Sequence, residues 1–71
     1  MFRMIVEKQL NIKDRTLLLG IPNDGAIPNG VACNGGEFRV IGRSYGARPP
    51  YISLEIEKTD VDLAGVEIRG R

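Results

Sequence analysis

The chain contains no histidine and no tryptophan, and its only serines are Ser44 and Ser53. Without histidine, neither a Ser–His nor a Cys–His nucleophilic pair can form. Glu55 and Glu57 fall on one face of an alternating strand pattern, where acidic side chains are usually solvated. These absences predict a protein that is not an enzyme and that uses no cofactor.

Cysteine is equally scarce, because Cys33 is the only one in the chain. A single thiol excludes an intramolecular disulfide and a thiolate metal cluster within one chain. Cys33 follows the apolar residues Val31 and Ala32, which favours a small buried hydrophobic residue over a nucleophile. Asp60 and Asp62 have the spacing of a cation loop but lack its other oxygen ligands, so they indicate a capped turn and no metal site.

Long apolar runs and an excess of one charge are also missing. The run Leu17–Leu19 is far too short to span a membrane, and Glu7 interrupts the N-terminus before a secretory signal can form. The net charge is +1, so no global field attracts the chain to nucleic acid or to a membrane. We therefore expect a cytoplasmic protein with no membrane partner.

The chain does contain a series of short segments with the two-residue period of β-strands. Residues 2–12 carry apolar side chains mainly at even positions, which predicts an inward even face, including Leu10 and Ile12, and a bulge near Lys8. The run Leu17–Leu19 predicts burial on both sides of the next strand. The further predicted strands are 15–21, 31–33, 37–43, 51–58 and 66–69.

Glycine recurs every five residues at Gly20, Gly25 and Gly30, and Ile-Pro-Asn occurs at both 21–23 and 27–29. Asparagine and glycine tolerate the backbone of tight turns, so this stretch predicts turns at 23–25 and 29–30. We expect Ile21 and Ile27 to fill the core from either side of these turns. Three more features complete the pattern: a hairpin at 34–36, one helical turn capped at 59–60, and a turn at 65.

Six short strands in 71 residues leave two exposed sheet edges unless the sheet closes on itself. Closure predicts an all-β fold, a small closed six-stranded antiparallel β-barrel with residues 1–71 forming a single domain. A different small barrel, of the SH3-like or oligonucleotide-binding type, is the alternative.

Three elements occur in the order found in one known family. They are Gly20-x4-Gly25-x4-Gly30, the strand end Phe38-Arg-Val-Ile-Gly42, and the closing stretch Asp62-Leu-Ala-Gly-Val-Glu-Ile-Arg-Gly70. This pattern resembles the second, β-barrel domain of elongation-factor-Tu-like translation factors, from about residue 4 to residue 70. The chain lacks the Gly-x4-Gly-Lys-Ser/Thr phosphate loop of their GTPase domain. The resemblance therefore implies a free-standing barrel without a nucleotide cofactor, and it suggests contact with a tRNA end or ribosomal RNA.

One segment concentrates basic and aromatic side chains without an acidic residue between Glu37 and Glu55. Arginine grips phosphates and tyrosine stacks on unpaired bases, which suits RNA. The same residue types anchor protein interfaces. A third interpretation is a rigid loop whose tyrosines cover the barrel mouth and whose arginines pair with Glu55 and Glu57. The candidate binding residues are Arg39, Arg43, Tyr45, Arg48 and Tyr51.

These observations favour two functions. The first is a non-catalytic binding module that engages a protein partner, aided by exposed apolar area near Ile5, Ile41 and Tyr51 or by an unpaired edge of the strand at 2–12. The second is a barrel that binds RNA, a ribosome or a tRNA end, with Arg39, Arg43 and Arg48 converging on one face. In either case we expect a monomer.

Overall fold

The computed structural model describes residues 1–23 and 26–71, and it folds these residues into six β-strands. The predicted turn at 23–25 and Gly25 therefore lie partly or wholly outside the described residues. The strands are β1 (Arg3–Ile12), β2 (Arg15–Pro22), β3 (Gly30–Cys33), β4 (Gly36–Ser44), β5 (Ile52–Glu57) and β6 (Glu67–Gly70).

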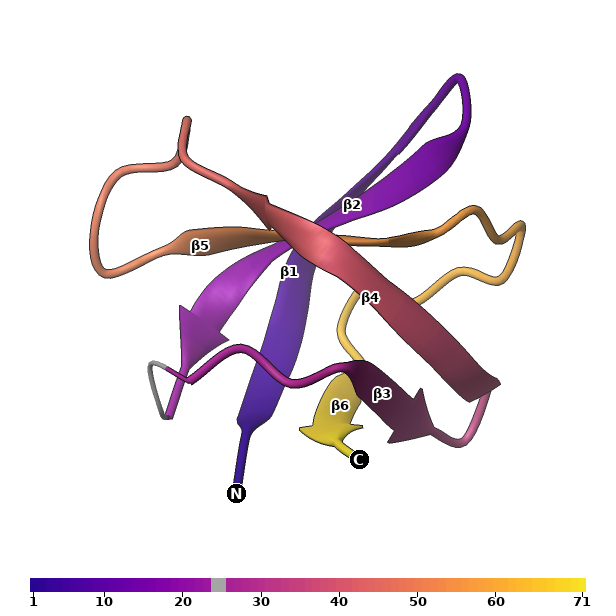
Figure 1. Cartoon of the computed structure of the whole chain (residues 1–71). Coiled ribbons are helices and arrows are strands. Elements are labelled where there is room, and N and C mark those ends of the chain that lie inside the picture. The colour runs from indigo at the N-terminus through magenta and orange to yellow at the C-terminus, as the bar shows by residue number, and fades with distance from the viewer. Residues whose placement is uncertain (24–25) are drawn as a thin grey trace.

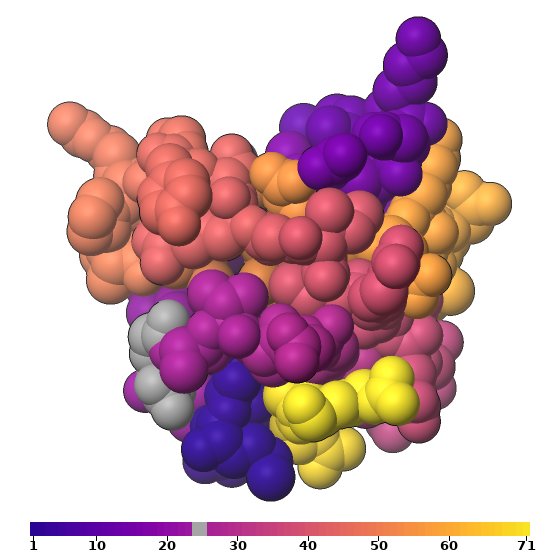
Figure 2. Space-filling model, viewed as in Figure 1, coloured from indigo at the N-terminus to yellow at the C-terminus, as the bar shows by residue number. Residues whose placement is uncertain are grey.

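The strands close into an antiparallel barrel in the order β1-β2-β5-β4-β3-β6, with β6 pairing back to β1 (Figure 1). This confirms the predicted all-β, six-stranded closed barrel. The two chain ends lie side by side at one end of the barrel, where the Gly70 amide donates to the Phe2 carbonyl at 2.8 Å. On the opposite side, the β1–β2 hairpin and the loop after β4 form two projections (Figure 2).

Apolar side chains of alternating strand positions fill the barrel. In β5 the predicted inward residues Ile52, Leu54 and Ile56 are all buried. Leu63, from the segment before β6, closes one end of the core. The remaining buried hydrophobic residues are Phe2, Met4, Val6, Leu18, Val31, Phe38 and Ile68.

A bulge divides β1 between Val6 and Lys8, as the sequence predicts. Met4 and Val6 point into the core, but beyond the bulge the alternation is shifted by one residue. The predicted inward orientation of Leu10 and Ile12 is wrong, because both are exposed and Gln9 occupies the inner side instead. One extra residue moves every later side chain to the other face of a strand.

β2 alternates more strictly than its three leucines suggest. Leu18 is fully buried, whereas Leu17 and Leu19 are half-buried on the outer side. Ile27 packs against the core as predicted, but the core position predicted for Ile21 is wrong, because 45% of Ile21 is exposed. Ile21 lies opposite the outward-facing Ile5, which places it outside the barrel wall.

The regularly spaced glycines do not share one role. At Gly20 a Cβ atom would lie only 2.4 Å from the carbonyl oxygen of Ile5, so β1 and β2 approach too closely there for any side chain. The turns that need a positive φ are instead at Gly36 (φ 128°) and Gly65 (φ 81°). The predicted hairpin at 34–36 and the turn at 65 are thus confirmed.

The described residues after β5 contain no helical turn, so that prediction is wrong. The polar side chains there bind local amides instead: Thr59 Oγ1 accepts from Val61 N, and Asp62 Oδ1 accepts from Ala64 N, both at 3.1 Å. Such bonds stabilise tight turns in place of a helix. Across the residues that the structure describes, no helix has the length and apolar character needed to cross a membrane.

Candidate binding surfaces

A second bulge, between Val40 and Gly42, separates the candidate arginines of β4. Arg39 precedes it and is exposed on the outer face. Arg43 follows it and lies opposite the buried Leu54, so its side chain starts on the inner face at the end of the barrel. The structure therefore does not bring Arg39 and Arg43 to one face of the strand.

Among the five candidate residues, the side chains of Arg43 and Tyr45 lie close together. The guanidinium carbon of Arg43 lies 5.1 Å from the centre of the Tyr45 ring, within the range of a cation–π contact. Tyr45 is 84% exposed, so the ring face away from Arg43 is open to solvent. Arg43 Nε is buried and has no hydrogen-bond partner among the described residues. The pair thus presents an aromatic platform supported from one side.

Arg48 and Tyr51 meet through the backbone, because the Tyr51 amide donates to the Arg48 carbonyl at 2.9 Å. The Arg48 side chain is exposed and Tyr51 is half-buried. The Tyr51 hydroxyl donates to Glu7 Oε1 on β1 at 3.5 Å. Tyr51 therefore connects the loop after β4 with the outer face of β1.

The two glutamates of β5 have partners other than the candidate arginine side chains. Arg15 Nη1 donates to Glu55 Oε1 at 2.5 Å, and Arg15 Nε also contacts Asp14 at 3.1 Å. Glu57 Oε1 accepts a hydrogen bond from the backbone amide of Arg39 at 2.8 Å. Within the described residues, the side chains of Arg39, Arg43 and Arg48 thus form none of the ion pairs with Glu55 and Glu57 considered above.

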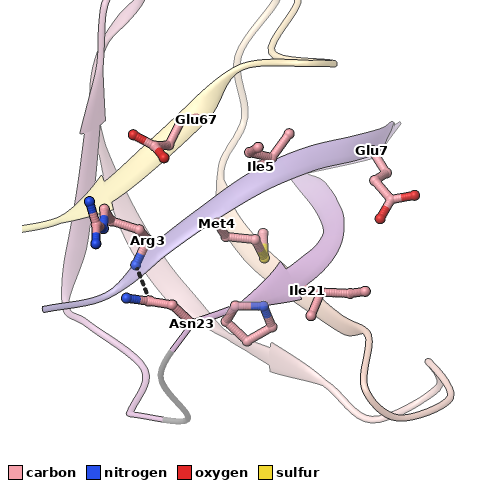
Figure 3. A pocket seen from close by; sticks show the side chains of 8 residues that line it. Arg3, Met4, Ile5, Glu7, Ile21, Asn23 and Glu67 are labelled. Atoms are coloured by element: carbon pink, nitrogen blue, oxygen red, sulfur yellow. Dashed lines mark hydrogen bonds between the residues drawn. The ribbon is translucent and has the colours of Figure 1, made fainter.

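A groove that the sequence did not reveal runs along the outer face of β1 (Figure 3). Ile5 and Ile21 form its apolar floor as a directly opposed pair, 56% and 45% exposed. Arg3 lies toward one end and Glu7 toward the other, on the same strand as Ile5 (Figure 3). The groove has a volume of about 750 Å³, and its remaining lining residues are Met4, Pro22, Asn23 and Glu67.

Asn23 fixes the basic end of this groove. Its Oδ1 accepts from the Arg3 amide at 2.6 Å, its own amide donates to the Arg3 carbonyl at 3.0 Å, and its Nδ2 donates to the Met1 carbonyl at 3.0 Å. These three bonds hold the chain after β2 against the start of β1. The backbone that carries Arg3 is therefore anchored although its side chain is exposed.

The only sequence signal for this groove is Ile5, an apolar residue on the otherwise polar side of the first strand. Ile21 and Glu67 are its neighbours on β2 and β6, at long sequence separations. A single sequence does not show which strands pair, so the three residues could not be grouped before the barrel order was known.

Comparisons of the chain with protein-family models, with curated proteins and with solved structures return no match.

Proposed function

We propose that this protein is a non-catalytic binding module that engages a protein partner through the outer face of β1 and β2. The observation that carries the proposal is the solvent-exposed Ile5–Ile21 pair on the floor of the groove. Large apolar side chains that gather in a groove rimmed by polar residues are typical of interaction sites.

The apolar character continues along the same two strands. Leu10 is 58% exposed and lies opposite the half-buried Leu17, and the next pair toward the groove is Lys8 with Leu19. The resulting outer face is mixed, with apolar side chains between polar ones, as in non-obligate interfaces. The part of β1 at the groove pairs with both β2 and β6, so a partner binds here through side chains and not by extending the sheet. We infer that the module acts in the cytoplasm as a monomer.

Site-specific photo-cross-linking tests this function. A benzoylphenylalanine replaces Ile5 in one variant and Ile41 in a matched control, since Ile41 is 42% exposed but lies on β4, away from β1 in the barrel order. We expect a discrete cross-linked protein band from the position 5 variant, identified by mass spectrometry, and none from the control. Equal labelling from both positions, or none from either, would contradict the proposal.

The Arg43–Tyr45 platform favours a second candidate, binding of single-stranded RNA or a tRNA end. A ring with one open face can stack a base, and the exposed Arg48 nearby can contact phosphate. The resemblance to the second domain of elongation-factor-Tu-like factors suggests the same role. Titrating isotope-labelled protein with short single-stranded RNA at low salt should shift the amides of residues 43–51 and lose the shifts as salt rises. Unchanged spectra would exclude this candidate.

A further inference from the structure

Arg3, at one end of the groove, has a second arginine beside it, and neither forms an ion pair with an acidic residue among those that the structure describes. Arg3 on β1 lies directly opposite Arg69 on β6, and both are exposed. Neither guanidinium forms an ion pair or a hydrogen bond with any residue that the structure describes. Like charges directly opposite each other on neighbouring strands repel. An anionic group placed between them would therefore be stabilised.

Two other arginines near strand ends do form ion pairs. Arg71 Nη2 contacts Glu37 at 3.0 Å, and Arg15 contacts both Asp14 and Glu55. Glu67 is the acidic residue closest to Arg69 along β6, but it lies opposite Ile5 and pairs with neither Arg3 nor Arg69. Within residues 1–23 and 26–71, the Arg3–Arg69 pair is thus two neighbouring positive charges without an ion-pair partner, beside the apolar floor.

Along β1 the groove has a defined charge order. Arg3, Ile5 and Glu7 all line it, at alternate positions of one strand (Figure 3). Alternate residues of a regular strand are separated by roughly 6.6–6.8 Å, so Arg3 and Ile5 present a positive and an apolar group at this interval, and the negative Glu7 follows at the bulge. An extended chain lying along β1 would project its own alternate side chains with the same spacing.

We propose that the groove binds an extended segment of a partner protein with an acidic, an apolar and a basic side chain at alternate positions. The acidic group lies between Arg3 and Arg69, where planar guanidinium groups can grip a carboxylate. The apolar side chain covers Ile5 and Ile21, and the basic group meets Glu7. This inference rests on the proposed protein-binding function and specifies the chemistry of the partner.

A peptide titration followed by amide shifts tests the charge order. The probe is the capped peptide Ac-GETLTKG-NH2, and its neutral control Ac-GQTLTQG-NH2 replaces both charged residues by glutamine. We expect saturable shifts at residues 3–7, 21–23 and 67–69, with the neutral peptide binding about two- to fivefold more weakly, as for exposed ion pairs. The difference should shrink in high salt, because exposed charges are screened.

Protein variants separate the arginines from the rest of the groove. In Arg3→Gln/Arg69→Gln, the preference for the charged peptide should fall to the part that Glu7 supplies, while the affinity for the neutral peptide stays the same. The matched control is Arg39→Gln, an exposed arginine of β4, which should retain the full preference. An equal loss in the control would show a general charge effect and overturn the proposal.

Three other results of the peptide titration would each lead to a different conclusion. If the neutral peptide binds as tightly as the charged one, the charge order is overturned while the apolar docking function stands. If neither peptide shifts the groove residues, the proposed peptide chemistry is overturned, and the cross-link from position 5 independently decides whether a partner binds there. If the groove amides shift with protein concentration alone, a second copy of the chain fills the groove and the proposal is overturned.

Discussion

The two halves of β1 carry similar apolar residues at even positions but turn them to opposite sides of the barrel wall. Before the bulge, Met4 is buried in the core; after it, Leu10 is 58% exposed. The first half pairs with both β2 and β6, whereas the second half pairs with β2 alone. The even-numbered side chains of the first half thus fill the core and those of the second half face solvent, because one extra residue reverses the orientation of everything that follows.

The largest effect that separates the two halves should come from truncating their even-numbered side chains. Met4→Ala removes a buried side chain and should lower the free energy of unfolding by about 2–5 kcal/mol. Leu10→Ala removes an exposed one and should change it by at most about 0.5 kcal/mol. Urea denaturation of both variants measures the difference. Similar losses for both would mean that Leu10 packs inside the barrel.

The sequence was sufficient for the strand pattern, because alternation is visible in each short segment. Barrel closure followed from the number of strands, and the hairpin at 34–36 followed from its asparagine and glycines. The bulge near Lys8 is predictable as well, but the apolar pattern does not show that the residues after it change faces, so the predicted inward orientation of Leu10 and Ile12 is wrong. A shift of a single residue leaves no mark in a pattern that only records which residues are apolar.

The binding surfaces are harder to predict from the sequence, because bulges and strand register decide which side chains share a face. Arg39 and Arg43 are close in sequence, but the bulge between Val40 and Gly42 places them on opposite faces of β4. Ile5 and Ile21 are distant in sequence, and only the register of β1 with β2 brings them together. Proximity along the chain was therefore a poor guide to proximity on the surface.

An effect of intermediate size is expected at Gln9. The bulge turns this side chain toward the inner face, where an uninterrupted alternation would place Leu10. Its Oε1 accepts from the Leu63 amide at 2.6 Å, and its Nε2 donates to the Val61 carbonyl at 2.9 Å. Gln9→Ala leaves the amide of the buried Leu63 without this acceptor and should cost about 1–3 kcal/mol.

Hydrogen exchange at the Leu63 amide reports this contact directly. We expect faster exchange in Gln9→Ala than in the original chain, while Lys8→Ala, which alters an exposed neighbour on the same strand, should leave exchange unchanged. Unaltered exchange at Leu63 in Gln9→Ala would show that Gln9 does not hold the segment before β6.

The smallest expected effect concerns the turn that follows the second half of β1, where Asp14 and Arg15 lead into β2. A hydrogen bond from Arg15, reinforced by attraction between the two charges, lowers the pKa of Asp14 below its ordinary value of 3.8. The folded chain then binds this proton less readily than the unfolded chain does. The ion pair therefore contributes stability above about pH 3.8, and the contribution is lost as the pH falls through the lowered folded pKa.

A carbon-detected titration of the Asp14 carboxyl group measures this pKa in the folded chain. We expect a midpoint below 3.8 that moves back toward 3.8 in Arg15→Gln, because that variant removes the neighbouring charge. The effect on stability should be slight, since Asp14 is exposed and solvent screens the pair. A midpoint at or above 3.8 in the original chain would show that Arg15 forms an ion pair with Glu55 on β5 and not with Asp14. The end of the hairpin would then contact the rest of the barrel only through β2 and β5.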